Sequence, residues 1–373
     1  PDVIVAGAGI VGAACAEACA RAGLRVAVYD PAGIGTGATA AGMGHLVVMD
    51  DSEAQFALTR CSQQLWRQRA VELPKTVEYT ASGTLWVAAD DEEMGEVRRK
   101  QSFYAERGVA SEILDGAALA AAEPNLRRLA GALRVPGDAV IYPPCAAEFL
   151  LERALERGAT FVRGRAVAAW AQGRGQLDDG TGIAAARLVN AAGAAAPRLT
   201  PGLPIRPRKG HLLITDRYPG WLRHQLVELG YLKSAHASDA DSVAFNAQPR
   251  ATGQILIGSS RQFDAVDGGV DQAMLARMLR RAQEYMPGMG KLSGIRAWTG
   301  FRAATPDSLP LIGPAPGDTS VFLATGHEGL GITTALATGA LVAAALTGAA
   351  PPLPPEPYLP TRPSLLTRHA LHD

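Results

Sequence analysis

The pattern Gly7-Ala8-Gly9-Ile10-Val11-Gly12 constrains the fold of this chain more than any other feature. It follows the apolar run VIVA at residues 3–6, which suits a buried parallel strand, and it opens a helix rich in small residues over 10–22. A second strand, RVAVY at 25–29, leads directly to Asp30. A strand, a glycine-rich turn, a helix and an acid after the next strand are typical of the β-α-β unit that binds dinucleotides.

The glycines of this turn have separate roles in such a unit. The first permits the tight turn, the second lets a pyrophosphate approach the backbone, and the third lets the helix pack on the strand. The helix N-terminus faces the phosphates. We expect Asp30 to accept hydrogen bonds from the adenosine ribose hydroxyls, and its charge disfavours a 2′-phosphate. The alternative is that the glycines only shape a tight turn from strand to helix.

Glycine is also frequent elsewhere in the chain. The 41 glycines among 373 residues exceed the average usage of roughly 7%. The stretch GIGTGATAAGMG at 33–44 is too glycine-rich for a regular element and too apolar for a solvated linker, so it suits a loop beneath a diphosphate and ribityl chain. The tiny residues of Asn190-Ala191-Ala192-Gly193 suit a backbone pressed against a cofactor. These two features favour FAD over a nicotinamide cofactor.

Charge, cysteines and hydropathy exclude several classes of partner. The 36 Lys plus Arg balance 36 Asp plus Glu, so we expect neither nucleic acid nor an anionic membrane as partner. The four cysteines show no CxxC and no metal-ligand spacing, which predicts no metal site and fits a reducing compartment. The uncharged stretch 330–346 barely reaches the length of a membrane span. Its alanines, threonines and glycines favour a closely packed buried helix over a transmembrane one.

Six motifs occur in order along the chain: VIVAGAGIVG, GTGATAAGMG, LVNAAG, PRATGQILIGSS, TGFRAATPDSLPLIGP and ATGHEGLGI. Through them the chain resembles the D-amino-acid-oxidase-type family of FAD-dependent oxidoreductases, which includes glycine oxidase, sarcosine oxidase and the D-hydroxyproline dehydrogenase β subunit. The resemblance extends over residues 2–350.

The resemblance implies an α/β fold, in which a Rossmann-type FAD-binding domain contains an inserted α+β substrate domain built on an antiparallel sheet. The alternating strands RKGHLLIT, SVAFNAQ and GQILIGSS agree with such a sheet. The proline-rich residues 351–373 are expected to form an extended C-terminal tail. The FAD-binding domain is assigned to 1–80, 137–204 and 296–350, and the substrate domain to 81–136 and 205–295.

Members of this family oxidise a C–N bond: hydride leaves the carbon next to the amine for flavin N5, and an imine forms. Arg302 matches the family's carboxylate-binding arginine, and its planar fork suits bidentate recognition. The alternative is that Arg302 caps its turn or pairs with Asp307. The helix start at 329–332 is expected to stabilise the negative charge of reduced flavin, unless its glycines serve only a tight helix start.

Three further residues are candidates for the chemistry. His327 matches a common family residue and is either structural or catalytic. Glu328 either approaches the substrate amine or caps the helix, and His45 either lies over the flavin or packs in its loop. In glycine-oxidase-like members a tyrosine often precedes the motif equivalent to PRATGQILIG, whereas this chain offers Asn246 or Tyr231 as substitutes.

The motifs and the resemblance together give one set of predicted cofactor contacts, and the catalytic candidates are Arg302, His327, Glu328 and His45. The cofactor contacts are Gly7, Gly9, Ile10, Val11, Gly12, Asp30, Pro31, Thr36, Gly37, Ala38, Ala41, Gly42, Met43, Gly44, Val167, Ala191, Ala192, Gly193, Arg302, Gly329, Leu330, Gly331 and Ile332.

The function that the resemblance implies is FAD-dependent oxidation of a small amino or imino acid. The segment GHEGLGITTALATG is more similar to a D-amino-acid or D-hydroxyproline-type dehydrogenase than to a glycine or sarcosine-type oxidase. Such a dehydrogenase passes electrons to partner subunits, whereas the oxidase uses O2. A non-catalytic flavin subunit for electron transfer or assembly is an alternative from another class. We expect a cytoplasmic protein, peripheral to the inner membrane if it is a dehydrogenase.

Overall fold

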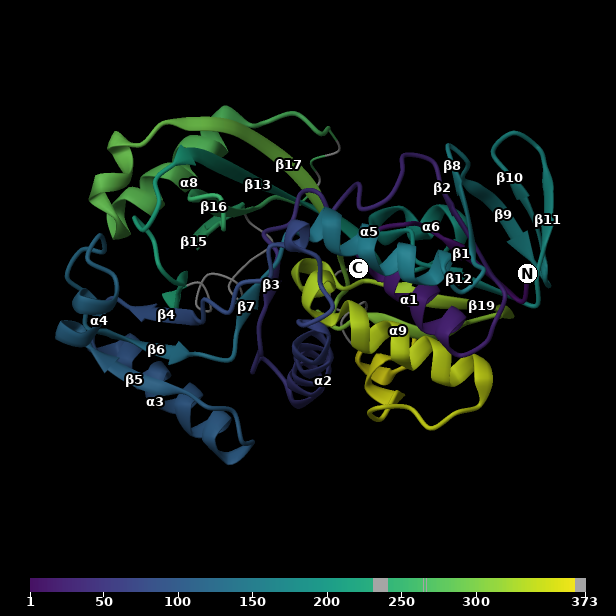
Figure 1. Cartoon of the computed structure of the whole chain (residues 1–373), viewed down its shortest axis with the longest axis horizontal. Helices are drawn as coiled ribbons and strands as arrows, with labels where there is room; N and C mark the ends of the chain where they lie inside the picture. The colour runs from purple at the N-terminus through teal and green to yellow at the C-terminus, as the bar shows by residue number, and fades with distance from the viewer. Residues whose placement is uncertain (231–240, 264, 266, 366–373) are drawn as a thin grey trace. The chain divides into compact units, whose positions relative to one another are not determined.

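The chain folds into two compact units, each assembled from separate segments (Figure 1). The first unit contains residues 1–77, 142–207 and 301–373, and the second contains 78–141 and 208–300. The residues at which the chain passes from one unit to the other lie within five positions of the domain boundaries expected from the sequence. The computed structural model describes residues 1–230, 241–263, 265 and 267–365, so Tyr231 lies outside the described residues.

The first unit is built on a six-stranded sheet with the strand order β18-β19-β12-β1-β2-β8. All neighbouring strands pair in parallel except β18 and β19, which are antiparallel. Buried apolar runs form the central strands, as parallel strands covered on both faces require. The strands are β1 (Val3–Ala6), β2 (Val26–Asp30), β8 (Thr160–Arg163), β12 (Arg187–Asn190), β18 (Leu311–Ala315) and β19 (Asp318–Thr325).

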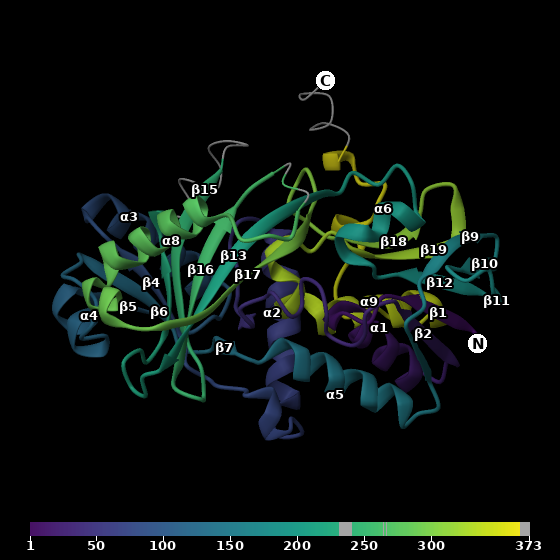
Figure 2. The ribbon, with the colours of Figure 1, turned by 90° about the horizontal axis from the view of Figure 1, so that it is seen from above.

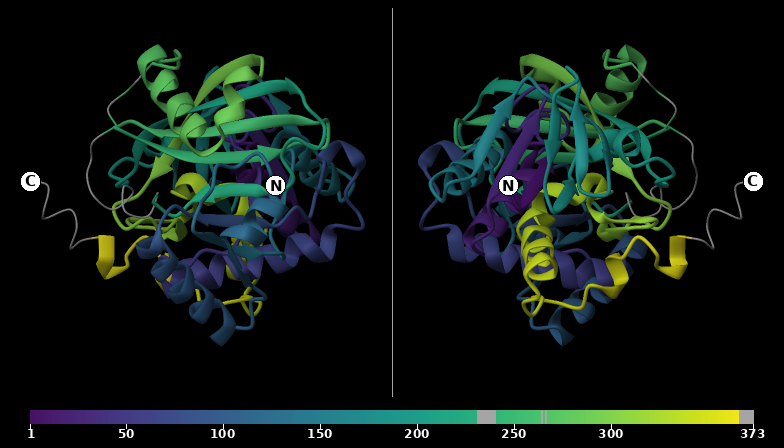
Figure 3. Two further views of the ribbon diagram at one scale, coloured as in Figure 1. Left: turned by 90° about the vertical axis from the view of Figure 1, so that its left-hand side faces the viewer. Right: turned by 90° about the vertical axis from the view of Figure 1, so that its right-hand side faces the viewer.

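The helices of the first unit pack closely because their contact faces carry small residues. Helix α1 (Ile10–Arg21) packs against α5 (Pro143–Leu155) and α9 (Gly331–Thr347), and α9 also contacts α2 (Glu53–Arg69) (Figure 3). A Cβ on Gly339 of α9 would lie 2.5 Å from the carbonyl oxygen of Ala14, so only glycine permits this approach.

The apolar segment Glu328–Thr347, which includes α9, is long and apolar enough to cross a membrane by length and composition alone. Of its most apolar 18-residue stretch, 67% is buried within the structure. A helix enclosed in a protein core meets the same criteria, and α9 lies against α1 and α2.

Smaller elements complete the first unit. A three-stranded antiparallel sheet follows β8, and short helical turns flank several strands and α9. These elements are β3 (His45–Leu46), η1 (Lys75–Val77), β9 (Val167–Ala171), β10 (Arg174–Leu177), β11 (Gly182–Ala184), η2 (Gly193–Ala195), α6 (Ala196–Leu199), η4 (Glu328–Leu330) and η5 (Glu356–Tyr358).

The second unit is built on an eight-stranded sheet with the order β17-β13-β16-β15-β14-β4-β6-β5. The sheet is largely antiparallel as expected, but β14 and β4 pair in parallel, so it is mixed. The elements are β4 (Thr84–Ala88), α3 (Asp91–Glu106), β5 (Glu112–Asp115), α4 (Gly116–Ala122), β6 (Gly131–Val135), β7 (Ala139–Val140), β13 (Arg206–Arg217), β14 (Gln225–Glu228), β15 (Ser242–Pro249), β16 (Gln254–Arg261), α8 (Gln272–Tyr285), η3 (Pro287–Lys291) and β17 (Gly294–Ala304).

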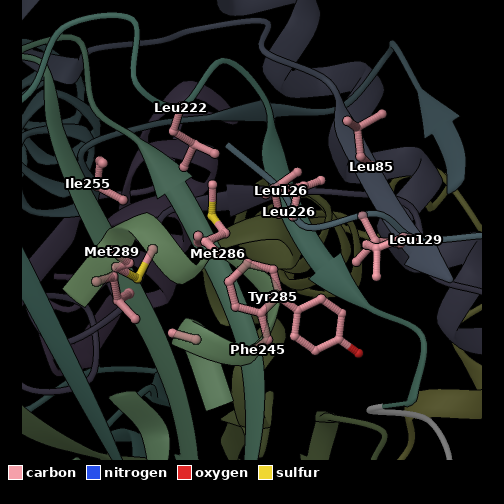
Figure 4. Close-up of a cluster of buried hydrophobic side chains, with 14 of the residues drawn as sticks. Leu85, Leu126, Leu129, Leu222, Leu226, Phe245, Ile255, Tyr285, Met286 and Met289 are labelled. Atoms are coloured by element: carbon pink, nitrogen blue, oxygen red, sulfur yellow. The ribbon is translucent and has the colours of Figure 1, made fainter. Parts of the chain in front are cut away.

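Helix α8 covers strands β15 and β16 and supplies much of the core of the second unit (Figure 2). Asp271 begins this helix by accepting hydrogen bonds from the backbone N–H groups of Ala273 and Met274. The rings of Phe245 and Tyr285 stack with centroids 4.7 Å apart, surrounded by leucines, isoleucines and methionines (Figure 4). Each unit therefore has a hydrophobic core of its own.

The C-terminal segment differs from the extended tail that its prolines predicted. The structure includes residues 351–365 in the first unit, where the short helical turn η5 forms. The hydroxyl of Tyr358 donates a 2.6 Å hydrogen bond to the carbonyl oxygen of Ala54, and the side chain of Arg362 is buried. Prolines forbid a long helix here but not docking, because tertiary hydrogen bonds replace the missing local ones.

Candidate cofactor site

The glycine-rich turn forms a bare backbone cradle between β1 and α1. Gly7 has φ +108°, and a Cβ there would lie 2.6 Å from the carbonyl oxygen of Ala191. A Cβ on Gly12 would lie only 2.0 Å from the carbonyl oxygen of Gly7, so the first turn of α1 packs directly on the strand end. Gly9, at the N-cap of α1, has no side chain to occupy the space in front of the helix start, so an anion can approach the backbone there.

Asp30 anchors this cradle from the end of β2. Its Oδ2 accepts a 2.8 Å hydrogen bond from the N–H of Ala8, and its Oδ1 accepts from Ala32 and Gly33 at 2.8 and 2.7 Å. This structural role was not predicted from the sequence. The ribose contact of Asp30 stays a prediction: Oδ1 already accepts two hydrogen bonds, whereas Oδ2 accepts one and has a further lone pair.

The glycine-rich loop at 33–44 folds back onto the cradle. The N–H of Gly35 donates to the carbonyl oxygen of Ala8 at 2.8 Å, and the N–H of Ile10 donates to Thr39 Oγ1 at 3.0 Å. Thr36 Oγ1 closes the loop by donating to the carbonyl oxygen of Gly33 at 3.0 Å. Thr39 was missed by the sequence reasoning, because its contact with the helix start is not local in sequence.

The end of β12 supplies a third wall of the cradle. Asn190 is fully buried, and its Nδ2 donates to the carbonyl oxygen of Ala196 and to Thr200 Oγ1 at 3.0 and 2.9 Å. These bonds fix the chain at Ala191-Ala192-Gly193, where Ala191 lies against Gly7. The position of this segment thus depends on Asn190, whereas the sequence pointed only to the small residues that follow it.

The start of α9 lies beside the same cradle. A Cβ on Gly331 would lie 3.7 Å from Val11 and 3.4 Å from His327, and a Cβ on Gly42 would lie 2.5 Å from Ile332 Cδ1. The structure therefore brings together the starts of α1 and α9 with the loop at 33–44. Leu330 immediately precedes α9, and its contact with the cofactor stays a prediction.

Arg302 lies at the same helix start. Its Nε is 3.8 Å from the position of a Cβ on Gly329, and burial lowers the pKa of Arg302 to about 10, which leaves it cationic at neutral pH. Asp307, the alternative partner considered for Arg302, forms an ion pair with Arg362, with Nε–Oδ2 at 2.7 Å. Glu328 has φ +49°, a left-handed conformation that is unusual outside glycine.

The two histidines have different surroundings. His327 is buried, its Nε2 lies 2.9 Å from Thr338 Oγ1 within α9, and burial lowers its pKa to about 3. This geometry favours a structural role. His45 Nε2 is buried with no hydrogen-bond partner among the described residues, while Thr333 Oγ1 donates to the carbonyl oxygen of His45 at 2.7 Å. Burial lowers the pKa of His45 to about 4.

The remaining predicted contacts are distributed around these segments. Met43 is buried, and the N–H of Ala41 donates to the carbonyl oxygen of Gly37 within the loop, which also contains Ala38 and Gly44. Pro31 is exposed next to Asp30. Val167 begins β9 and packs against the core of the first unit, and the geometry by itself gives it no cofactor role.

The site fits a dinucleotide cofactor by three independent observations. The cradle is too tight for any Cβ at Gly7 or Gly12, the N-terminus of α1 begins there at a glycine without a side chain, and the buried Nε2 of His45 has no hydrogen-bond partner in the part of the chain that the structure describes. Among the described residues no group of three or more His, Cys, Asp or Glu could hold a metal ion. The fold and site thus define a dinucleotide-binding protein of the Rossmann type.

Comparison with known proteins specifies the family. The family model described as FAD dependent oxidoreductase matches residues 2–345, so the chain belongs to this family, as its motifs predicted. The cofactor of this chain is therefore FAD, and the chain is an FAD-dependent enzyme.

Individual relatives are similar over nearly their whole length. The chain is 29% identical to the hydrogen cyanide synthase subunit HcnC of Pseudomonas aeruginosa, over 97% of this chain and 96% of that protein. It is 27% identical to a D-amino acid dehydrogenase of Methylobacterium nodulans, over 94% and 96%. The crystal structure of glycine oxidase from Geobacillus kaustophilus superposes with a TM-score of 0.87 at 26% identity, covering 97% of this chain and 98% of that one. The predicted fold class is thereby confirmed.

Proposed function

We propose that this enzyme oxidises the C–N bond of a small amino or imino acid to an imine. The observation that carries the proposal is Arg302, a partly buried cation beside Gly329 at the helix start that adjoins the cofactor cradle. Relatives named glycine oxidase and D-amino acid dehydrogenase support the same substrate class.

The residues of the chain itself would bind the substrate and stabilise the charges of the reaction. Arg302 would hold the substrate carboxylate through two parallel hydrogen bonds and so orient the carbon next to the amine. The N-terminus of α9, with Gly331 and Ile332, would stabilise negative charge that develops nearby. Bound FAD would supply the hydride acceptor for the oxidation at that carbon.

Among the possible electron acceptors we propose a partner subunit rather than O2. The relatives at 29% and 27% identity are named as a subunit of hydrogen cyanide synthase and as a dehydrogenase, which supports transfer within a complex. On this proposal the enzyme works in the cytoplasm or at the inner membrane. A glycine or sarcosine-type oxidase is the second candidate, supported by the structural similarity to glycine oxidase.

The test is anaerobic reduction of the bound flavin. The yellow protein is mixed with glycine, sarcosine, D-alanine, D-proline, trans-4-hydroxy-D-proline or L-proline, and bleaching of the visible absorption is followed. Reoxidation by air compared with an artificial acceptor then separates an oxidase from a dehydrogenase. Failure of every amine to bleach the flavin would overturn the proposal in favour of a non-catalytic flavin subunit.

Arg302→Ala provides the residue-level test. We expect KM for the reducing amino acid to rise roughly 100-fold, because a charge-assisted bidentate contact is worth up to about 3 kcal/mol. The bound FAD, measured by its absorption per protein, should stay unchanged. Arg302→Lys keeps the charge but not the planar fork and should recover only part of the loss. Unchanged kinetics in both variants would remove Arg302 from the substrate site.

A further inference from the structure

The buried ion pair between Arg362 and Asp307 connects the C-terminal segment to the turn that follows Arg302. Arg362 Nε and Nη2 donate to the two oxygens of Asp307, each at 2.7 Å, and Ser364 Oγ donates to Asp307 Oδ2 at 2.6 Å. The two charged side chains are only 4% and 7% exposed. A bidentate pair of this kind is strong because water does not screen it and its geometry is nearly fixed.

Arg362 also holds the backbone of the same turn. Its Nη1 donates to the carbonyl oxygen of Pro310 and its Nη2 to that of Leu309, both at 2.8 Å. Asp307 Oδ1 accepts from the N–H of Leu309 at 3.2 Å, and Ser308 has φ +61°. A non-glycine residue in this left-handed conformation is retained only where its surroundings enforce it. Arg362 contributes to these surroundings through its bonds to the carbonyl oxygens of Leu309 and Pro310.

The turn lies between two parts of the candidate site. Arg302 precedes it on β17, and Thr305 Oγ1 donates to the carbonyl oxygen of Leu309 across the turn at 2.8 Å. On the other side, a Cβ on Gly326 would lie 2.7 Å from Thr305 Cγ2, so the chain leading to His327 packs directly on the turn. Movement of the turn therefore displaces both neighbouring segments, because close-packed groups transmit strain.

We infer that Arg362 is a positioning residue, through which the C-terminal segment holds the turn at 305–310 and thereby the guanidinium of Arg302. The inference rests on the proposed carboxylate-binding role of Arg302. The family model ends at residue 345, so Arg362 lies in a part of the chain that the model does not match. Without Arg362, the carboxylate of Asp307 would be a buried charge without its cation, five positions along the chain from Arg302, and the turn would rearrange to hydrate it.

The test compares Arg362→Ala, Arg362→Lys and the double variant Arg362→Ala with Asp307→Asn. For the single alanine variant we expect KM to rise about tenfold or more while kcat changes less than about threefold, because positioning of the carboxylate is lost and the flavin is untouched. The lysine variant keeps the charge but loses the bidentate geometry and should show an intermediate KM. The double variant leaves no buried charge behind but still lacks the hydrogen bonds from Arg362 to the carbonyl oxygens of Pro310 and Leu309, so KM should recover only in part.

A second measurement does not depend on turnover. Acetate binding to the holoenzyme, followed by its perturbation of the flavin absorption, should weaken in Arg362→Ala by about the same factor as KM and recover in part in the double variant. Arg134→Ala, which removes an exposed ion pair with Glu112 in the second unit, is the matched control and should alter neither value.

Two results would overturn the inference. One is an unchanged KM and acetate affinity in Arg362→Ala and Arg362→Lys. The other is a loss that persists fully in the double variant, since this would mean that the C-terminal segment contributes only general stability. If Arg362→Ala fails to fold, the inference is tested by KM and acetate affinity in the Arg362→Lys and double variants. If no amino acid bleaches the flavin of the wild-type protein, the proposed function is wrong. If Arg302→Ala raises KM but Arg362→Ala does not, only the present inference is wrong.

Discussion

His45 and His327 are kept neutral in the folded protein, because burial lowers their pKa values to about 4 and about 3. In the unfolded chain both titrate near 6.5. The unfolded state therefore binds more protons below pH 6.5, so the histidine contribution to the free energy of unfolding is complete above that pH and decreases as the pH falls. The loss is at most about 1.4 kcal/mol per pH unit for each histidine.

The pH dependence of thermal unfolding tests this account. We expect Tm to fall between pH 7 and pH 5, and we expect His327→Gln to reduce that slope, because glutamine can still contact Thr338 but does not titrate in this range. Thr338→Val, which removes the partner and keeps the histidine, is the control and should retain the slope. Parallel curves for wild type and His327→Gln would contradict the prediction.

Gly12 is the residue at which the cradle tolerates least change. A Cβ there would lie 2.0 Å from the carbonyl oxygen of Gly7, and a backbone atom cannot move aside as a side chain can. We expect Gly12→Ala to weaken FAD binding by about 100-fold or more, as strain of about 3 kcal/mol implies. Gly23→Ala meets nothing within 4 Å but has φ +87°, so it should lower stability by about 1 kcal/mol and leave FAD affinity unchanged. FAD titration of the apoprotein measures both, and equal affinities would refute the cradle geometry.

At the scale of elements, the sequence predicted those helices and strands that depend on residues close together in the chain. The helix at α1 and the strand at β2 follow from apolar runs and glycine boundaries, and both are present. Thr39 and the ion pair of Asp307 with Arg362 were not foreseen, because each joins residues far apart in the chain. The parallel pairing of β14 with β4 was missed for the same reason, since strand alternation specifies faces and not partners.

The contact between the loop at 33–44 and α9 can be tested as a pair. A Cβ on Gly42 would lie 2.5 Å from Ile332 Cδ1, so Gly42→Ala should separate the loop from the helix start and weaken FAD binding by about tenfold. Ile332→Val removes that methyl group, and the double variant should regain most of the affinity. The coupling is read from FAD titrations of the four proteins in a double-mutant cycle. Additive losses would show that the two positions do not interact.

At the scale of the whole molecule, each unit has a separate hydrophobic core, whereas the cofactor cradle belongs entirely to the first unit. The cradle joins the turn at 7–12, the loop at 33–44 and the helix start at 329–332, which only the folded first unit brings together. The order of the motifs indicated this assembly from separate segments. The sequence could not identify the contacts that close it, because they depend on atoms from all three segments.

Removal of FAD should therefore affect the two units differently. A cofactor that binds only the folded state stabilises it by an amount that grows with its concentration above Kd, about 4 kcal/mol at 1,000-fold excess. We expect amide hydrogen exchange in the apoprotein to accelerate at 7–12, 33–44 and 327–333, while the amides around the stacked Phe245 and Tyr285 keep their protection. Exchange measured by mass spectrometry on holoprotein, apoprotein and FAD-reconstituted protein gives the comparison, and reconstitution should restore the slow exchange. Equal acceleration in both cores would instead mean that the cofactor stabilises the molecule as a single cooperative unit.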